Sequence, residues 1–327
     1  MSPRVIRCRQ RGVAMLAAVL LVALGTMLAT AIAFHSGMMA RRATATFAFE
    51  QALLVAQGAE ALAAYVLRED ARSDARGGVA RDHLQEPWAQ PVGPVEIIPG
   101  VVLEAGLTDL QGRFNLNSLV DAQGQRDPVA MEIFERLLAK LGLEEKWAEL
   151  IADWIDANIA TEDFDGAEDG TYTAFDPPYR TPNTLITSPS ELLALPEFGR
   201  ERYLRLAPYV TALPRDATIN VCTASAALLD AMIGPAYEEF SRDPENLSRQ
   251  REEDGCWPTA DDFRQVLESE ERDEQLRQAI AQRVGEDSKY YRLTSVVTIG
   301  TTQIALYSLL LHEQNGTRVI QRSYSPD

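Results

Sequence analysis

Seven carboxylates, which could bind a metal ion, crowd into one stretch of the chain. No lysine or arginine lies between the first and the last of them, so the stretch is strongly negative. Like charges this close repel one another unless a cation neutralises them, and oxygen ligands of this kind favour Ca²⁺. A solvated acidic loop without a bound ion is the alternative. The seven residues are Asp156, Glu162, Asp163, Asp165, Glu168, Asp169 and Asp176.

Cysteine is the second chemically informative residue type. The chain has three cysteines, Cys8, Cys222 and Cys256. If the chain is exported, Cys222 and Cys256 would lie in an oxidising compartment, where disulfides persist. A disulfide between them and two separate buried thiols remain alternatives, because spacing alone does not fix connectivity.

Motifs typical of enzymes are absent from the sequence. Its three histidines are His35, His83 and His312, and His312-Glu313 is not followed by the spaced second histidine of a zinc protease helix. The G-x-S-x-G, Walker and G-x-G-x-x-G patterns do not occur. We therefore expect a protein that is not an enzyme.

The N-terminus predicts a membrane anchor that must position everything after it. An uncharged apolar run from Val13 to Phe34 is long enough, as a helix, to cross a bilayer core. Arginines 4, 7, 9 and 11 precede the run, whereas Arg41 and Arg42 follow it, so the positive-inside bias keeps the N-terminus cytoplasmic and exports the rest. A cleaved secretory signal is the alternative, because residues 31–33 read Ala-Ile-Ala, but the run exceeds the usual apolar region of about 7–15 residues.

The junction before the run resembles a type IV prepilin-like signal. A short basic leader ends at Gly12 and the apolar helix starts directly at Val13. The resemblance implies that prepilin peptidase cuts between Gly12 and Val13, and that the helix stays in place with a methylated N-terminus. Pilins usually have a glutamate at the fifth mature position, where this chain has Ala17.

Hydrophobic periodicity divides the rest of the chain into strand-forming and helical parts. The helical pattern continues from the membrane to about residue 68, and residues 70–99 read as a loop with one short strand. Strand patterns at 95–119 and 289–325, the latter with an Asn315-Gly316 hairpin turn, bracket a helical block. We expect an α+β protein with a leader (1–12), a transmembrane helix (13–34), a discontinuous α/β domain (35–125 and 286–327) and an inserted helical domain (126–285).

Four stretches, in this order, resemble the GspK class of minor pseudopilins of the type II secretion system. They are the Gly12 junction without its glutamate, DLQGRFNLN (109–117), DWIDANIATEDFDGAEDGTYTAFDPPYR (153–180) and PYVTALPRDATINVCTA (208–224). Cys222 stands where the family usually has asparagine. The resemblance implies a structural protein of the bacterial inner membrane, with most of the chain periplasmic. It would cap the pseudopilus tip together with GspI- and GspJ-type minor pseudopilins and other secretion components.

The same resemblance implies a structural calcium site. The G-A-E-D segment of the family, here Gly166–Asp169, lies in its calcium-binding region. Such an ion would clamp a long loop that has few apolar residues of its own. The expected ligands are Glu168 and Asp169 first, and then Asp156, Asp165 and Asp176.

A membrane-anchored DNA-uptake protein is the alternative function. Residues 192–199 (LLALPEFG) resemble a helix-hairpin-helix, a module whose backbone amides approach phosphate. Glu197, however, occupies a hairpin position usually held by glycine, and the chain has a formal net charge of −17. Both features repel a phosphate backbone, so we expect no nucleic-acid binding and a structural use of the hairpin.

Overall fold

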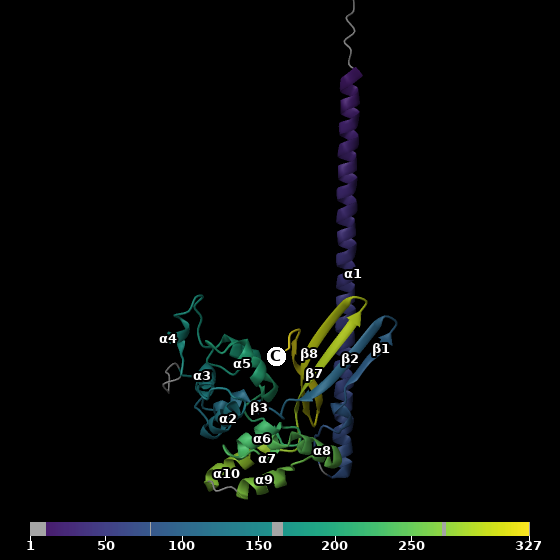
Figure 1. The fold of residues 1–327 in the computed structure, drawn as a ribbon. Coiled ribbons are helices and arrows are strands. Elements are labelled where there is room, and N and C mark those ends of the chain that lie inside the picture. The colour runs from purple at the N-terminus through teal and green to yellow at the C-terminus, as the bar shows by residue number, and fades with distance from the viewer. Residues whose placement is uncertain (1–10, 79, 159–165, 270–272, 327) are drawn as a thin grey trace, which may run out of the picture.

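The computed structural model describes residues 11–78, 80–158, 166–269 and 273–326. Its first element, α1 (Arg11–Gly77), is one helix of 67 residues, which is about 100 Å long at the usual rise. Within the described chain, one helix is long and apolar enough to cross a membrane, and the rest of the protein does not bury that window. Figure 1 shows the N-terminal part of α1 standing clear of the other elements.

The last part of α1 lies against a five-stranded antiparallel sheet. The strands are β1 (Val92–Ile98), β2 (Val101–Asp109), β7 (Tyr290–Ile299), β8 (Thr302–Glu313) and β9 (Gly316–Ser323), in that spatial order. β2 pairs with β7 from Val101–Ile299 to Asp109–Tyr291, although the helical domain separates them in sequence. The fold class expected from the sequence, α+β with a long N-terminal helix, is confirmed.

Small side chains bring α1 close to the sheet. Its buried face carries four alanines and one leucine at helical spacing, and these pack against apolar residues of β2, β7 and β8. The one carboxylate on this face, Glu60, is 6% exposed and accepts two hydrogen bonds from Arg322, at 2.7 and 2.8 Å, and one from Ser308. The alanine face consists of Ala52, Ala56, Ala59, Ala63 and Leu67.

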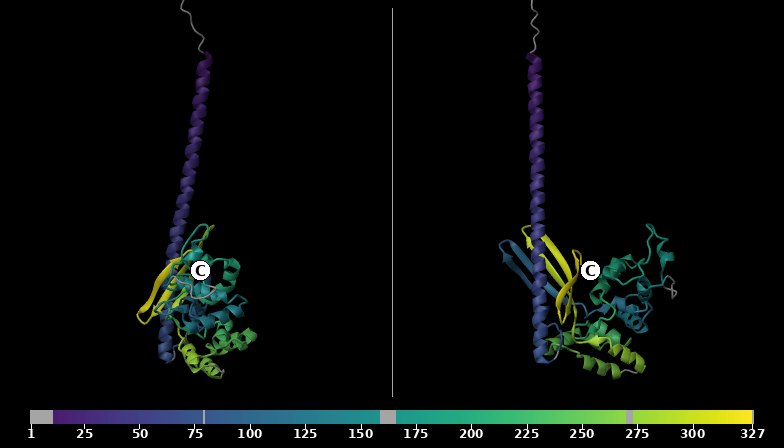
Figure 2. Two further views of the ribbon diagram at one scale, coloured as in Figure 1. Left: turned by 90° about the vertical axis from the view of Figure 1, so that its left-hand side faces the viewer. Right: turned by 180° about the vertical axis from the view of Figure 1, so that it is seen from behind.

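A second core belongs to the helical domain, which lies beside the sheet near the C-terminal end of α1 (Figure 2). This core also includes Phe114, Leu116 and Leu119, so the chain before residue 126 already packs into it. Two short parallel pairs complete the domain: β3 (Phe114–Asn115) with β4 (Val210–Thr211), and β5 (Ile219–Asn220) with β6 (Val284–Gly285). Its helices are η2 (Leu116–Leu119), α2 (Pro128–Lys140), α3 (Lys146–Ile155), α4 (Asp169–Tyr172), η3 (Pro189–Ala194), α5 (Gly199–Leu206), η4 (Ala207–Tyr209), α6 (Ala226–Ile233), α7 (Glu239–Arg242), α8 (Pro244–Asp254), α9 (Ala260–Ser269) and α10 (Glu274–Ala281).

Two helix starts show why the sequence folds this way locally. Asp127 accepts hydrogen bonds from the backbone of the first turn of α2, with Pro128 at the first helical position. Ser188 and Glu191 form a reciprocal capping box at η3. Both starts have a capping residue directly before a proline, a sequence pattern typical of a helix N-terminus.

Several boundaries differ from the prediction. α1 continues to Gly77 rather than ending near residue 68, because no proline or cap stops it, and η1 (Pro87–Ala89) follows. Phe114 and Leu116 do not form a long half-buried strand, since Asn115 caps the turn η2 after two paired residues. The two residues of the β8–β9 turn are Gln314 and Asn315, with Gly316 already paired at φ 122°.

Candidate functional site

Three carboxylates meet at the end of α3. Asp153 lies in the last turn of α3, Asp156 caps its C-terminus, and Glu168 directly precedes α4. One carboxylate oxygen of each residue lies within 4.8 Å of the others, and all three residues are buried. Because Asp153 and Asp156 are one helical turn apart, they share a face, and the returning chain brings Glu168 against it.

Each carboxylate of this group accepts a hydrogen bond from a described side chain. Arg126 donates to Asp153, Asn158 donates to Asp156, and the Thr181 hydroxyl donates to Glu168 Oε2 at 3.1 Å. Glu168 Oε1 is buried and has no hydrogen-bond partner among the described residues. Burial, with the charges of Asp156 and Asp153 added, raises the pKa of Glu168 to about 6.

The structure brings together two of the five expected calcium ligands, Asp156 and Glu168. Asp169 lies beside them, where it accepts hydrogen bonds from Thr181 and pairs with Arg180 at 3.6 Å. Asp176 is exposed and is not one of the three grouped carboxylates. Asp165 lies outside the described residues, as do Glu162 and Asp163. Sequence reasoning missed Asp153, although its spacing from Asp156 on an amphipathic helix was a usable signal.

Aromatic residues anchor the chain that follows the carboxylates. Tyr172 is fully buried and packs edge-on against Trp154, with ring centroids 5.3 Å apart. Tyr179 packs on both of these rings, and Phe175 stacks on Tyr179. The expectation that this stretch lacks apolar anchors was therefore wrong for its second half, residues 172–179.

Amide side chains in the DLQGRFNLN segment bind the backbone of distant segments. Asn117 donates to the carbonyls of Ile186 and Leu213, each at 2.9 Å, and accepts from the Ile186 amide at 2.8 Å. Asn115 bonds in the same way to Leu213 and Pro214. These asparagines satisfy buried backbone groups that no strand pairs, so their role is structural.

The DLQGRFNLN segment (109–117) and the INVCTA segment (219–224) meet at Asp109, where β2 ends. The carboxylate of Asp109 accepts hydrogen bonds from Thr223, from Ser288 (2.8 Å), from Asn220 (3.2 Å) and from the Gln111 amide (2.7 Å). Burial raises the pKa of Asp109, and these hydrogen bonds oppose that rise. Donors from the middle of the helical domain and from the segment before β7 thus meet at one buried carboxylate of the sheet.

Gly112 is required at this junction by close packing. A Cβ atom there would lie 2.7 Å from the hydroxyl oxygen and 2.8 Å from the carbonyl oxygen of Thr223. Gly112 lies in the turn after β2, and this close approach to the INVCTA segment leaves no room for a side chain there.

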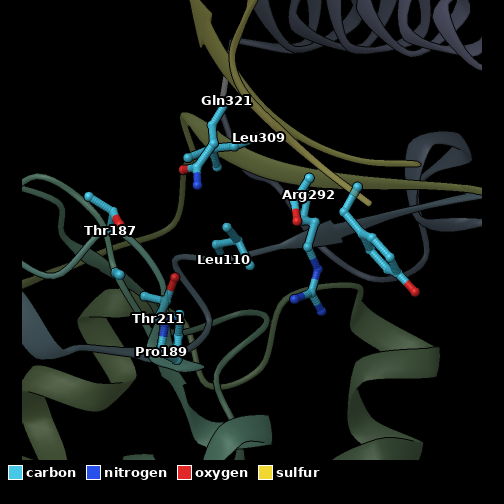
Figure 3. Close-up of a pocket in the computed structure, with 10 residues that line it drawn as sticks. Leu110, Thr187, Pro189, Thr211, Arg292, Leu309 and Gln321 are labelled. Atoms are coloured by element: carbon cyan, nitrogen blue, oxygen red, sulfur yellow. The ribbon is translucent and has the colours of Figure 1, made fainter. Parts of the chain in front are cut away.

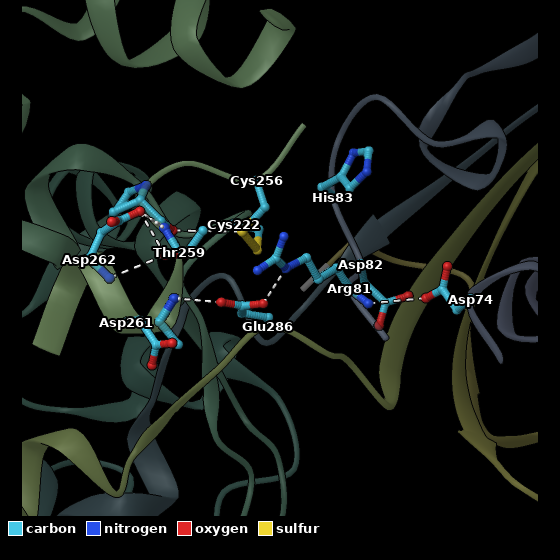
Figure 4. Close-up of polar contacts among 12 residues, drawn as sticks. Asp74, Arg81, Asp82, His83, Cys222, Cys256, Thr259, Asp261, Asp262 and Glu286 are labelled. Carbon is cyan, nitrogen blue, oxygen red and sulfur yellow. Dashed lines mark hydrogen bonds and ion pairs between the residues drawn. A yellow bond between two sulfur atoms is a disulfide. The ribbon is translucent and has the colours of Figure 1, made fainter. Parts of the chain in front are cut away.

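Cys222 and Cys256 are joined in a disulfide, with Cα atoms 4.5 Å apart and a sequence separation of 34. The disulfide links the INVCTA segment to the loop between α8 and α9, as Figure 4 shows. In the same region Arg81 pairs with Glu286, whose other carboxylate oxygen accepts from the Ala260 amide at 2.7 Å. The disulfide therefore holds the α8–α9 loop to the INVCTA segment, and polar contacts through Glu286 join the start of α9 to Arg81 in the chain that follows α1.

The segment that resembles a helix-hairpin-helix, residues 192–199, is held by buried apolar side chains and by Arg202. Leu192, Leu195 and Phe198 are buried in the core, and the Arg202 guanidinium donates to the carbonyls of Glu197 (3.0 Å) and Phe198. Glu197 has a φ of 62°, a conformation that favours glycine, and its side chain is exposed. An exposed carboxylate on the hairpin opposes phosphate binding, so the geometry supports a packing role.

The contact between the sheet and the helical domain leaves little space for a ligand. A cavity of about 30 Å³ lies there, which is small for a ligand. Figure 3 shows Leu110 and Arg292 facing Thr187 and Thr211 across it. This contact can bind the two domains together, but it does not form a substrate pocket.

One face of α1 is apolar and uncovered beyond the membrane segment. We call it the outer stripe of α1; its residues are Phe47, Leu54, Gly58, Ala61 and Tyr65, on the side away from the alanine face. Phe47, Leu54 and Tyr65 are 72%, 68% and 51% exposed. Contiguous exposed apolar residues of this kind mark interaction surfaces, and Gly58 allows a neighbouring helix to come close.

The fold and the sequence of this chain are both similar to known proteins. The fold is similar to a chain in the crystal structure of the GspK-GspI-GspJ complex from the type 2 secretion system of enterotoxigenic Escherichia coli. That match has a TM-score of 0.74 and 25% identity, and it covers 88% of this chain and all of the other. A family model described as type II secretion system (T2SS), protein K, matches residues 112–215, which include the Asn117 contacts and the carboxylate group.

Relatives that align along nearly the full length name the family. The chain is 34% identical to type II secretion system protein K of Pseudomonas aeruginosa over 96% of its own length and 92% of the relative's. It is 30% identical to protein K of Pectobacterium carotovorum over 97% of both chains. The chain belongs to the type II secretion system protein K family.

Proposed function

We propose that this chain is a minor pseudopilin at the tip of the type II secretion pseudopilus, where it acts as a structural component in protein export across the outer membrane. The full-length similarity to protein K carries the proposal. The chain is anchored in the bacterial inner membrane by the N-terminal part of α1, and the sheet and helical domain lie in the periplasm. Its motif residues serve packing and domain contacts, in keeping with a role that is structural and not catalytic.

The partners in this proposal are GspI- and GspJ-type minor pseudopilins. Support comes from the similar chain in the GspK-GspI-GspJ crystal structure and from the outer stripe of α1. A partner anchored in the same membrane sends its own helix alongside α1, where the stripe would otherwise face water. Burying its large residues would favour association by roughly 1.5–3 kcal/mol for each fully buried side chain.

The tip position follows from two features. Ordinary pilins pair the glutamate at their fifth mature position with the N-terminus of a neighbouring subunit, and this chain has Ala17 there. A carboxylate in hydrocarbon is costly unless it is paired, so a subunit with no subunit above it gains by omitting the carboxylate. The helical domain, beside the sheet, adds bulk that obstructs a further subunit.

Co-purification tests this function. The full chain, in detergent, should elute with GspI- and GspJ-type partners as one complex and should not form fibres alone. Leu54→Asp should weaken the complex at least tenfold, which is about 1.4 kcal/mol. The control Leu204→Asp changes a similarly exposed leucine of the helical domain and should leave the complex intact. Homopolymeric fibres of this chain would contradict the proposal.

We also propose cleavage by prepilin peptidase between Gly12 and Val13, near the start of α1 in the uncleaved chain. The basic leader and the uninterrupted helix beyond residue 33 support this position. Mass spectrometry of the mature chain should find an N-terminal Val13, and Gly12→Val should block processing. A mature chain starting at Phe34 would show that an ordinary signal peptidase acts instead.

A structural calcium ion is proposed at the carboxylate group of α3. The residues fit such an ion, because Glu168 Oε1 is buried and unpartnered in the described structure and hard oxygen atoms are what Ca²⁺ prefers. Asp153, Asp156 and Glu168 would hold it, with Asp169 and Asp165 as further candidates. The ion would neutralise the repulsion between these carboxylates and fix the chain between α3 and α4.

A further inference from the structure

A second group of carboxylates gathers at the far end of α1, away from α3. Asp70 and Asp74 lie in its last turns, and Asp82 and Glu86 lie in the segment that follows. Oxygen atoms of Asp70, Asp82 and Glu86 lie within 4.8 Å of one another. Asp74 accepts a hydrogen bond from the Arg81 backbone amide at 3.0 Å. We call these four residues the α1-end cluster.

Asp82 connects the parts of the protein that meet here. Its carboxylate accepts hydrogen bonds from the Tyr291 hydroxyl of β7 at 2.7 Å and from the Ser288 amide at 2.6 Å. Its backbone amide donates to the Glu286 carbonyl, and its carbonyl accepts from Asn220 of the helical domain at 2.8 Å. Asp82 therefore ties the segment after α1 to both the sheet and the helical domain.

The basic groups nearby are directed elsewhere or are not strong cations. The Arg81 guanidinium pairs with Glu286, away from the α1-end cluster. His83 Nε2 lies 3.6 Å from Glu86, and this ring carries charge only when it is protonated. Glu86 also accepts hydrogen bonds from the His83 backbone amide (2.9 Å) and from Trp88 Nε1 (2.6 Å), but burial outweighs them and its pKa is raised.

The remaining titratable neighbours add negative charge or line an open space. Asp109 lies on the buried side of the cluster. The pKa of Tyr291 is raised well above its ordinary value, first by burial and then by the charges of Asp82 and Asp109. On the other side a cavity of about 550 Å³ is lined by Asp74, Asp82, Asp287, Lys289, His312 and Glu313. This cavity is large enough to admit water, which gives the cluster a route for protons.

The consequence of this crowding is proton binding near neutral pH. Burial, with repulsion from Glu86, Asp82 and Asp74, raises the pKa of Asp70 to about 7. Burial also raises the pKa of Asp82 to about 7 despite the hydrogen bonds from Tyr291 and Ser288, and it raises the pKa of Glu86. Because these groups interact, they bind the proton as a unit.

We propose that the α1-end cluster is a proton-dependent latch, which holds the end of α1 to β7 and to the helical domain while it shares a proton and loosens when that proton leaves. If the segment 80–90 opens, its carboxylates become hydrated and lose their tight hold on the proton. The closed form therefore binds protons more tightly than the open form, and a rise in pH favours opening. The latch would control how firmly the helical domain is oriented on α1, which goes beyond the proposed function.

Hydrogen–deuterium exchange of the full chain in detergent micelles tests the latch. The readout is the protection of backbone amides in residues 80–90, corrected for the intrinsic pH dependence of exchange and measured in a constant excess of calcium. For one shared proton, protection should fall about tenfold per pH unit from about pH 5 to about pH 7 and then level off. Asp70→Asn, which puts a neutral amide in the cluster, should flatten this dependence.

Two controls keep the test decisive. Glu69→Gln, one residue away and paired with Arg72 outside the cluster, should retain the wild-type slope. Glu86→Gln should flatten the slope as Asp70→Asn does, and it decides the matter if Asp70→Asn lowers protection throughout the sheet. A slope near zero in the wild type, as expected if a cation fills the cluster, would overturn the proposal. So would an unchanged slope in a folded Asp70→Asn variant.

Discussion

At the scale of single residues, polar side chains do most of the positioning in this protein. Asn115 and Asn117 satisfy backbone groups of segments far away in sequence, and Asp109 gathers donors from three parts of the chain. Glu168 differs from them, because one of its oxygen atoms is buried without a partner among the described residues. A buried acceptor of this kind is costly, so an ion there would stabilise the fold.

Glu168→Gln tests the ion at this scale. In wild type, calcium should raise the unfolding midpoint relative to chelator. At a hundredfold excess of calcium over the dissociation constant, the free energy of unfolding should rise by about 2.7 kcal/mol. The variant should lose this response, and in chelator it should be at least as stable as wild type, because a buried like charge is gone. Asp176→Asn is the matched control and should keep the response; a calcium effect that survives Glu168→Gln would exclude this site.

The sequence predicted only part of the carboxylate group at α3. It indicated an acidic stretch and placed Asp156 and Glu168 in it, but the pairing of Asp153 with them depends on how the chain returns after α3. The carboxylates nearest in sequence are not all nearest in space, since Asp176 is exposed and Asp169 bonds to Thr181. Periodicity reports the faces of helices and says nothing of the path of a loop.

At the scale of elements, the α1–sheet contact combines close packing with one ion pair, between Glu60 and Arg322. Alanines at the contact let the helix approach the strands, while Glu60 reaches Arg322 and Ser308. Burial raises the pKa of Glu60, but hydrogen bonds from Arg322 and Ser308 outweigh it and hold this pKa below its ordinary value. Because this folded-state pKa is lowered, the contribution is present above the unfolded-state pKa and is lost as the pH falls through the folded-state value.

Glu60→Gln should therefore destabilise the chain by about 1–3 kcal/mol near neutral pH. This value lies below the usual cost for a fully buried pair because the Arg322 side chain is 48% exposed. The measurement is denaturant unfolding with a double-mutant cycle against Arg322→Gln. If the two substitutions prove additive, Glu60 and Arg322 do not interact as described.

Long periodic elements were the predictable part of the fold. Strands from both predicted regions join one sheet, β1 and β2 from the first and β7, β8 and β9 from the second, and the helical domain separates them in sequence. The end of α1 and the short strand β3 were mispredicted. Helix ends depend on tertiary contacts where no cap or proline is present, and Asn115 acts through partners about 100 positions away in sequence.

At the scale of the whole molecule, the exposed N-terminal part of α1 is followed by two hydrophobic cores, one between α1 and the sheet and one in the helical domain. The disulfide lies within the helical domain, and it holds the α8–α9 region to the segment that contacts Asp109. In the chain-entropy model a closed loop of this length contributes about 3–4 kcal/mol, because the bond restricts the unfolded chain.

Replacing Cys222 and Cys256 together with alanine should lower the free energy of unfolding by roughly that amount. The same loss should appear when wild type is unfolded in reductant, because both thiols are buried in the fold. Thiol titration of the unfolded chain supplies the control and should find no free thiol at these positions without reductant. Two free thiols there would contradict the disulfide.

If this chain joins a pseudopilus tip through the outer stripe of α1, the stripe must contact a partner subunit, and site-specific photo-cross-linking in the assembled secretion system can capture that contact. A photoreactive residue in place of Leu54, 68% exposed, is compared with one in place of Ala63, which is buried against the sheet. The account predicts adducts with GspI- or GspJ-type subunits from position 54 and intramolecular products from position 63. Adducts of position 54 with a second copy of this chain, or none with either partner, would contradict it.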